Sequence, residues 1–364
     1  MNKSKDNLAN QVASASLFSK RATAQYLQQN QRRWLLIAIA LVLLILSFCL
    51  DIALGPGAYS ISEVLQALFQ PATTSNDIVV VVQDIRLPIA LMAVLVGVML
   101  AISGASMQTI LRNPLAEPFT LGISAAASFG ASTAIALGWS IIPTLGVWSI
   151  TLNSFVFALL VTFTLYGVVR VKGATTETMI LTGIALLFTF NALTALLQYG
   201  ASETQAQQII FWAFGSLGRA NIFKIIVCAV ICTFALPLIM RESSRLTLLQ
   251  LGDERAASMG VNVNALRLQM LVISSLLAAV AVSFVGVIGF VGLVGPHIAR
   301  LLIGENQKFF IPMSALCGAL LLSAASVLSK TIHPGVVYPV GIITSLIGVP
   351  FFFMLALSRK KGEL

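Results

Sequence analysis

The chain has 364 residues, of which 58% are hydrophobic and 10% are charged, and its mean hydropathy is +0.94. Long apolar runs recur along it, which excludes a soluble globular protein and predicts a polytopic membrane protein. The net charge of +9 does not indicate a nucleic-acid-binding protein, because the basic residues are spread along loop edges and do not cluster with aromatic residues.

The N-terminal segment, residues 1–31, is polar and rich in Gln, Ala, Ser and Asn. It holds too little apolar surface to offset the entropy lost on ordering, so we expect a mobile cytoplasmic tail. The remaining residues, 32–364, are expected to form one transmembrane domain.

Apolar windows predict an all-α fold with about ten transmembrane helices. The expected spans are residues 34–54, 87–111, 120–138, 150–169, 178–199, 223–240, 268–286, 288–303, 310–329 and 340–357. If both termini are cytoplasmic, most Lys and Arg residues lie on the inner side, as the positive-inside rule requires. The basic residues left on the outer side are Arg86, Arg219, Lys224 and Lys330.

Shorter helices are expected between the spans. Ile61–Phe69 has apolar residues at helical spacing and is predicted to lie flat at the outer interface. Gln205–Gly218 has an apolar centre too short to cross the bilayer, which favours an interfacial or re-entrant helix. In the eighth span, recurring Gly residues and Pro296 predict a short, irregular helix that approaches its neighbour closely.

The long polar interval Arg241–Arg267 separates two blocks of spans. Within it, Asp253 and Glu254 open a stretch of about two helical turns and Gly260 closes it, which matches the positive N-terminus and the left-handed exit of a helix. We predict a short coupling helix outside the bilayer that docks into another protein through its small and apolar residues Ala256, Ala257 and Met259. The alternative is a cytoplasmic loop that is helical but has no partner.

The charged residues and motifs bear on the energy source. No acidic residue can be placed at the middle of a predicted span, whereas proton- or sodium-driven carriers usually keep an ionisable group there. The chain also has no G-x-x-x-x-G-K-[ST] loop, H-E-x-x-H or G-x-S-x-G motif. We therefore expect a transport subunit that is not an enzyme, with no catalytic residues, metal site or cofactor of its own and an external energy source.

Polar side chains follow one face of the fifth span. Asn191, Thr194 and Gln198 are spaced three and four residues apart, so they share a stripe on a helix. Such a stripe either lines a water-filled path or forms hydrogen bonds with a neighbouring helix.

Four segments resemble the permease subunits of type II ABC importers for ferric siderophores, haem and cobalamin, the FecCD family. The segments are RNPLAEPFTLGISAAASFGA (112–131), LGDERAASMGV (251–261), GFVGLVGPHIAR (289–300) and YPVGIITSLIGVPFFFML (338–355). The similarity runs from about residue 34 to the C-terminus. One departure is Val337, where many relatives have Glu.

The resemblance implies partners: two cytoplasmic ATPase subunits that carry ATP and Mg, a second permease copy or paralogue, and an extracytoplasmic substrate-binding protein, all around a subunit embedded in membrane lipid. It also implies a pathway along the permease interface, lined largely by the fifth and tenth spans, which would contain the stripe of Asn191, Thr194 and Gln198. The inner gate maps onto Thr176 and Glu177.

The resemblance assigns two contact regions. The ATPase contact maps onto the coupling segment, which comprises Leu251, Gly252, Asp253, Glu254, Ala256, Ala257, Met259, Gly260 and Val261. The contact with the binding protein maps onto the outward cations Arg86 and Lys330, where exposed ion pairs would orient docking more than they hold it. Snorkelling of these side chains at a span end is the alternative.

These observations predict a permease subunit of an ABC importer in the bacterial cytoplasmic (inner) membrane, with ferric siderophore as the first choice of substrate. Haem, cobalamin or an oxyanion are the alternative substrates. The main rival from another class is an ion-coupled secondary transporter that works alone, and an intramembrane enzyme lacks a recognisable pair of nucleophile and base.

Overall fold

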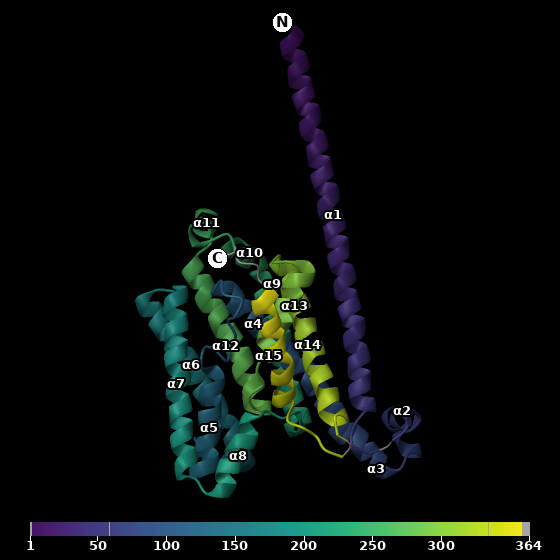
Figure 1. Ribbon diagram of the computed structural model, residues 1–364, viewed down its shortest axis with the longest axis vertical. Helices are drawn as coiled ribbons and strands as arrows, with labels where there is room; N and C mark the ends of the chain where they lie inside the picture. The colour runs from purple at the N-terminus through teal and green to yellow at the C-terminus, as the bar shows by residue number, and fades with distance from the viewer. Residues whose placement is uncertain (1, 58, 334, 359–364) are drawn as a thin grey trace.

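The computed structural model describes residues 2–57, 59–333 and 335–358, and the regular structure of these residues is entirely helical (Figure 1). Every predicted span contains an observed helix. These helices are α1 (Asn2–Ala53), α4 (Leu87–Ile110), α5 (Ile123–Leu137), α6 (Ser149–Lys172), α7 (Thr176–Gly200), α9 (Ile222–Arg241), α12 (Val263–Val285), α13 (Val291–Ile303), α14 (Gln307–Thr331) and α15 (Val340–Ser358).

Short helices connect the spans. They are α2 (Ile61–Phe69), η1 (Pro71–Thr73), α3 (Asn76–Val79), η2 (Val80–Arg86), η3 (Pro143–Trp148), α8 (Glu203–Ala213), η4 (Leu217–Arg219), α10 (Ser243–Leu249) and α11 (Asp253–Ser258). The predicted helix at Ile61–Phe69 is confirmed, and Ser60 and Glu63 form a capping box at its start. The helix predicted within Gln205–Gly218 is α8, which ends earlier than expected.

Seven helices in the described residues are long and apolar enough to cross a bilayer, and α5, α13 and Val340–Met354 are shorter apolar helices. The 15 residues of α5 and 13 residues of α13 rise only about 20 Å, which is less than the hydrocarbon thickness of about 30 Å. Each is preceded by a non-helical segment, 111–122 and 286–290. The first of these begins at Arg112 near one end of the bundle, and its residues 116–118 are buried. The prediction of a short, irregular eighth span is confirmed.

Helix α4 forms the centre of the bundle and packs against α14, α12, α13 and α9. Small residues allow close helix crossings there. A Cβ atom on Gly104 would overlap the carbonyl group of Gly292, and a Cβ atom on Gly97 would lie 2.6 Å from the carbonyl oxygen of Gly318. The close approach expected from the Gly-rich eighth span is thus made by Gly292, whereas Gly286 and Gly289 lie in the non-helical segment before α13.

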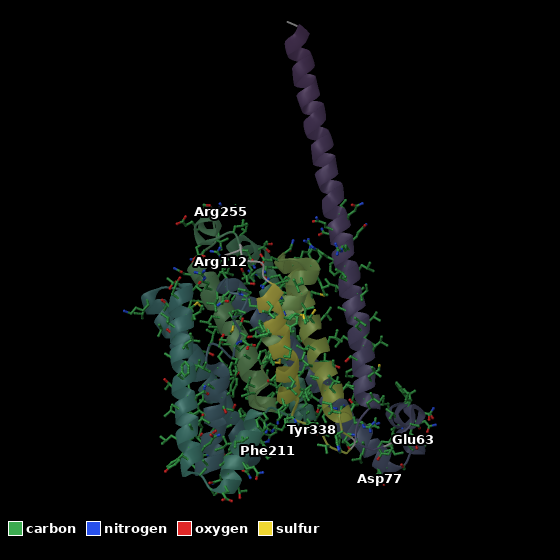
Figure 2. The ribbon with its side chains drawn as sticks, viewed as in Figure 1. Glu63, Asp77, Arg112, Phe211, Arg255 and Tyr338 are labelled. Atoms are coloured by element: carbon green, nitrogen blue, oxygen red, sulfur yellow. The ribbon has the colours of Figure 1, made fainter. Side chains whose placement is uncertain are left out.

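The two ends of the bundle carry different elements (Figure 1). We call them the α11 end, which also carries the N-terminal end of α1, and the α2 end. Figure 2 shows Arg112 and Arg255 at the α11 end, and Glu63 and Asp77 at the α2 end. Residues 2–31, expected as a mobile tail, continue α1 as a single helix that projects beyond the bundle.

Candidate functional site

The coupling segment forms a capped helix, as the sequence predicts. Asp253 and Glu254 lie in the first turn of α11, and Gly260 follows the helix with φ +85°. The N–H of Val261 donates to the carbonyl of Ala256 (3.0 Å), and the N–H of Gly260 donates to the carbonyl of Ala257 (2.9 Å). These two bonds form a Schellman motif, which ends a helix where glycine adopts the left-handed conformation.

The face of α11 differs from the predicted one. Ala256 is fully buried against the chain itself, so the prediction that it belongs to the docking face is wrong. The apolar residues that face outward are Met259 and Leu251, with 57% and 48% of their surface exposed, and Ala257 is exposed beside them. The sequence pattern predicted the helix but not which of its sides faces the bundle, because a helix of six residues has too few apolar positions to define a face.

Arg267 at the start of α12 joins the coupling segment to the bundle. Its guanidinium pairs with both oxygens of the Asp253 carboxylate, with Nη1 to Oδ2 at 2.8 Å and Nη2 to Oδ1 at 2.9 Å. Nη1 also donates to the carbonyl of Ala174 (2.7 Å), and Nε donates to the carbonyl of Ile110 at the end of α4 (2.9 Å). Sequence reasoning assigned Arg267 no role, although an Arg at the edge of this interval was the available signal.

The two residues expected at an inner gate begin α7. Thr176 is half-buried and Glu177 is exposed in the first turn, and the preceding Thr175 caps the helix by accepting a hydrogen bond from the N–H of Thr178. Ala174, which accepts from Arg267, lies two residues before Thr176. The start of α7 is therefore tied directly to the coupling segment.

The polar stripe lies on α7, which packs sparsely against the rest of the chain. Only 11% of the most apolar stretch of this helix is buried. Asn191 is exposed, whereas Thr194 and Gln198 are half-buried. The hydroxyl of Thr194 donates to the carbonyl of Phe190 within the same helix (2.8 Å). The expected role of the stripe in lining a pathway stays a prediction.

A cavity of about 560 Å³ opens between α15 and the segment before α13. Its lining is apolar apart from Glu117 and Ser345. Glu117 is buried, and its carboxylate lies beside the backbone of Phe290, which precedes α13. A Cβ atom on Gly292 would lie 3.5 Å from Oε2 of Glu117 and 2.9 Å from the carbonyl oxygen of Leu100, which is in the middle of α4.

The expectation that no acidic residue lies at mid-span depth is therefore wrong. We expected Glu117 in an inner loop, but residues 111–122 return into the bundle and bring its carboxylate to the N-terminus of the short helix α13. This position could not be predicted from sequence, because Glu117 lies in a polar stretch between two predicted spans.

The two cations expected to dock the binding protein are buried, with only 3% of Arg86 and 6% of Lys330 exposed. Arg86 donates to the carbonyls of Ile52, Ala53, Pro56 and Gly57 around the end of α1. Lys330 pairs with Asp51 at 2.6 Å. The expectation of exposed cations is wrong, because both side chains bond within this chain.

Comparison with known proteins identifies the family. The model of the FecCD transport family matches residues 43–358. The chain belongs to the FecCD transport family. It is an ABC transporter permease, and its multi-pass helical fold is the fold that this assignment requires.

This FecCD permease is similar to the hemin transport system permease of Yersinia pestis, with 37% identity over 76% of this chain and 83% of the relative. It is also similar to the iron(3+)-hydroxamate import permease FhuB of Bacillus subtilis, with 34% identity over 94% of this chain and 88% of the relative. A solved structure of a metal-chelate type ABC transporter in an inward-facing conformation matches with a TM-score of 0.76 and 30% identity, covering 90% of this chain and all of that chain.

Proposed function

We propose that this permease forms, with a second permease copy or paralogue, the membrane pathway for a ferric siderophore delivered by a substrate-binding protein. Its relatives are named for hemin and for iron(3+)-hydroxamate, which supports an iron chelate as cargo. Haem, cobalamin and an oxyanion are the alternative cargoes. The family assignment disfavours the ion-coupled secondary transporter.

The observation that carries the proposal is the exposed helix α11 at one end of the bundle. Leu251 and Met259 expose apolar surface there. A polar loop without a partner has no need of exposed apolar residues, so this surface favours a contact with another protein. An ATPase subunit that covers this surface would place α11 on the cytoplasmic side. The N-terminal end of α1 lies at the same end of the bundle, which agrees with cytoplasmic termini (Figure 1).

The pathway would run between two permeases along the faces that α7 and α15 leave uncovered. Phe188 and Leu196 on α7 are exposed, as are Leu346 and Phe353 on α15. Opening and closing would then follow from a population shift that ATP binding imposes through α11. Each closing motor domain would displace α11 relative to the bundle and move the start of α7.

The test is assembly and uptake with purified components. We expect the permease, reconstituted with its ATPase and binding protein in liposomes, to accumulate ferric siderophore only when ATP is present. The double variant Leu251→Glu/Met259→Glu should lose most of the bound ATPase, because two charges would be buried in an apolar contact. Val171→Glu is the control, since Val171 is an exposed apolar residue at the same end but on α6.

Uptake without ATP would contradict the proposal. So would equal recovery of the ATPase with the double variant and the wild type.

A further inference from the structure

The hydrogen bonds of the Arg267 side chain reach the coupling segment, the end of α4 and the residues just before α7 at the same time. The side chain is buried in the bundle, and its partners Asp253, Ile110 and Ala174 come from parts of the chain far apart in sequence. Because Ala174 lies just before the first turn of α7, a single side chain spans the distance between α11 and the residues expected at the gate.

The guanidinium makes this link rigid. It is planar, and its N–H groups leave in fixed directions, so the carboxylate of Asp253 and the carbonyls of Ala174 and Ile110 occupy positions set by one flat group. Nη1 serves both Asp253 and Ala174. A displacement of Asp253 must therefore move Arg267 with it, or break charge-assisted hydrogen bonds.

Arg267 also provides a hydrogen-bond donor to two backbone carbonyls near the ends of helices. The carbonyl of Ile110 is at the last turn of α4, where no further helical N–H reaches it, and Ala174 is buried beside Gly173, which has φ +95°. The loss of Arg267 would leave both carbonyls without this donor. These contacts give α11 two fixed points in the bundle, one at the end of the central helix α4 and one just before α7.

We propose that Arg267 is the positioning residue that transmits movement of α11 to the start of α7, and that its pairing with Asp253 sets how much transport each ATP molecule drives. This inference rests on the proposed function, since it assigns the route by which the ATPase acts. Arg267 does not touch the cargo. It acts on the gate through Ala174.

The test compares Arg267→Lys and Asp253→Asn in the reconstituted complex of permease, ATPase and binding protein. Lys keeps the positive charge but replaces the planar guanidinium with a single ammonium group. This group cannot bond to Asp253, Ala174 and Ile110 in the same fixed arrangement. We expect the amount of chelate transported per ATP hydrolysed to fall about tenfold, which is the effect of losing about one charge-assisted hydrogen bond. The ATPase should remain bound and active.

Asp253→Asn keeps the shape and one acceptor oxygen but removes the charge, so its transport per ATP should fall less, by about threefold. Asp253 is also 47% exposed, so this variant tests the link if Arg267→Lys does not assemble. Arg170→Lys is the control, because Arg170 is an exposed Arg in the last turn of α6, outside the coupling segment. It should transport as much per ATP as the wild type.

A purely structural role for Arg267 would lower the amount of complex but leave the ratio of transport to hydrolysis unchanged. An unchanged ratio in both variants would overturn this inference, while ATP-driven uptake by the wild type would still support the proposed function. If the wild-type complex shows no ATP-driven uptake, the proposed function fails, and the inference fails with it.

Discussion

Lys330 and Asp51 form an ion pair between α14 and α1, and both side chains are almost completely buried. Nζ of Lys330 also donates to the backbone carbonyl of Asp51, and the hydroxyl of Ser326 donates to Oδ1 of the same carboxylate (2.8 Å). Removing two charges from water is costly, and the attraction between them offsets this cost only while both are present. Lys330, which the sequence analysis assigned to a contact with the binding protein, therefore neutralises a buried charge within its own chain.

Lys330→Met should destabilise the permease strongly, because it leaves the buried carboxylate of Asp51 without its cation. We expect a loss of about 3–5 kcal/mol, measured as a lower unfolding temperature in detergent. The double variant Asp51→Asn/Lys330→Met should recover most of that loss, since it removes both charges. A full-stability Lys330→Met protein that no longer binds its substrate-binding protein would instead favour the docking role.

Helix crossings at glycine determine the architecture of the elements around α4. Gly104 of α4 lies against Gly292 of α13, and Gly97 lies against Gly318 of α14, so the backbones approach without intervening side chains. The first of these crossings also places the start of α13 beside Glu117. The cavity next to α15 therefore depends on a crossing at which two glycines meet and at which the side chain of Gln108 donates to the carbonyl of Gly292 (3.4 Å).

Gly104→Ala should weaken the α4–α13 crossing, because the new Cβ atom has no space beside the Gly292 carbonyl. We expect a loss of about 1–3 kcal/mol or more, read from the unfolding temperature. The matched control is Gly167→Ala in α6, where a Cβ atom would meet nothing within 4 Å. That substitution should stabilise the helix by about 0.5–1 kcal/mol, so equal effects of the two changes would contradict the role given to the crossing.

The bundle contains a buried acidic residue, Glu117, and carriers driven by ions also need a buried ionisable group. The buried carboxylate of Glu117 lines a cavity, and ionisable groups inside a membrane often serve proton transfer. Here, however, the carboxylate lies beside the backbone of Phe290, and among the residues that the structure describes no other acidic or basic residue lines the cavity. This arrangement fits a fixed cap on α13 better than a step in a proton relay.

The permease alone should therefore accumulate no iron chelate in liposomes when only a proton or sodium gradient is imposed. Uptake should be restored by adding the ATPase and the binding protein together with ATP. The measurement is retention of labelled iron inside the vesicles, with empty liposomes as the control. Gradient-driven uptake that Glu117→Gln abolishes would show that the ion-coupled alternative is correct.

The amino-acid sequence alone determined the elements and the family. Apolar runs located a helix in each predicted span, and seven of these helices are long enough to cross a bilayer. Burying apolar surface in lipid requires long helices whose backbone groups bond internally. Asp253, Glu254 and Gly260 located α11 because helix termini are local structures. The four motifs identified the family because they lie in continuous segments of the chain.

The tertiary structure alone decided which residues contact one another. The sequence could not show that Arg86 and Lys330 are buried, that Ala256 faces inward, or that residues 111–122 carry Glu117 back into the bundle. Nor could it connect Arg267 with Ile110 and Ala174, which are 157 and 93 residues away along the chain. The pairing of a buried charge depends on how helices that are distant in sequence pack together, and a pattern of neighbouring residues does not predict that packing.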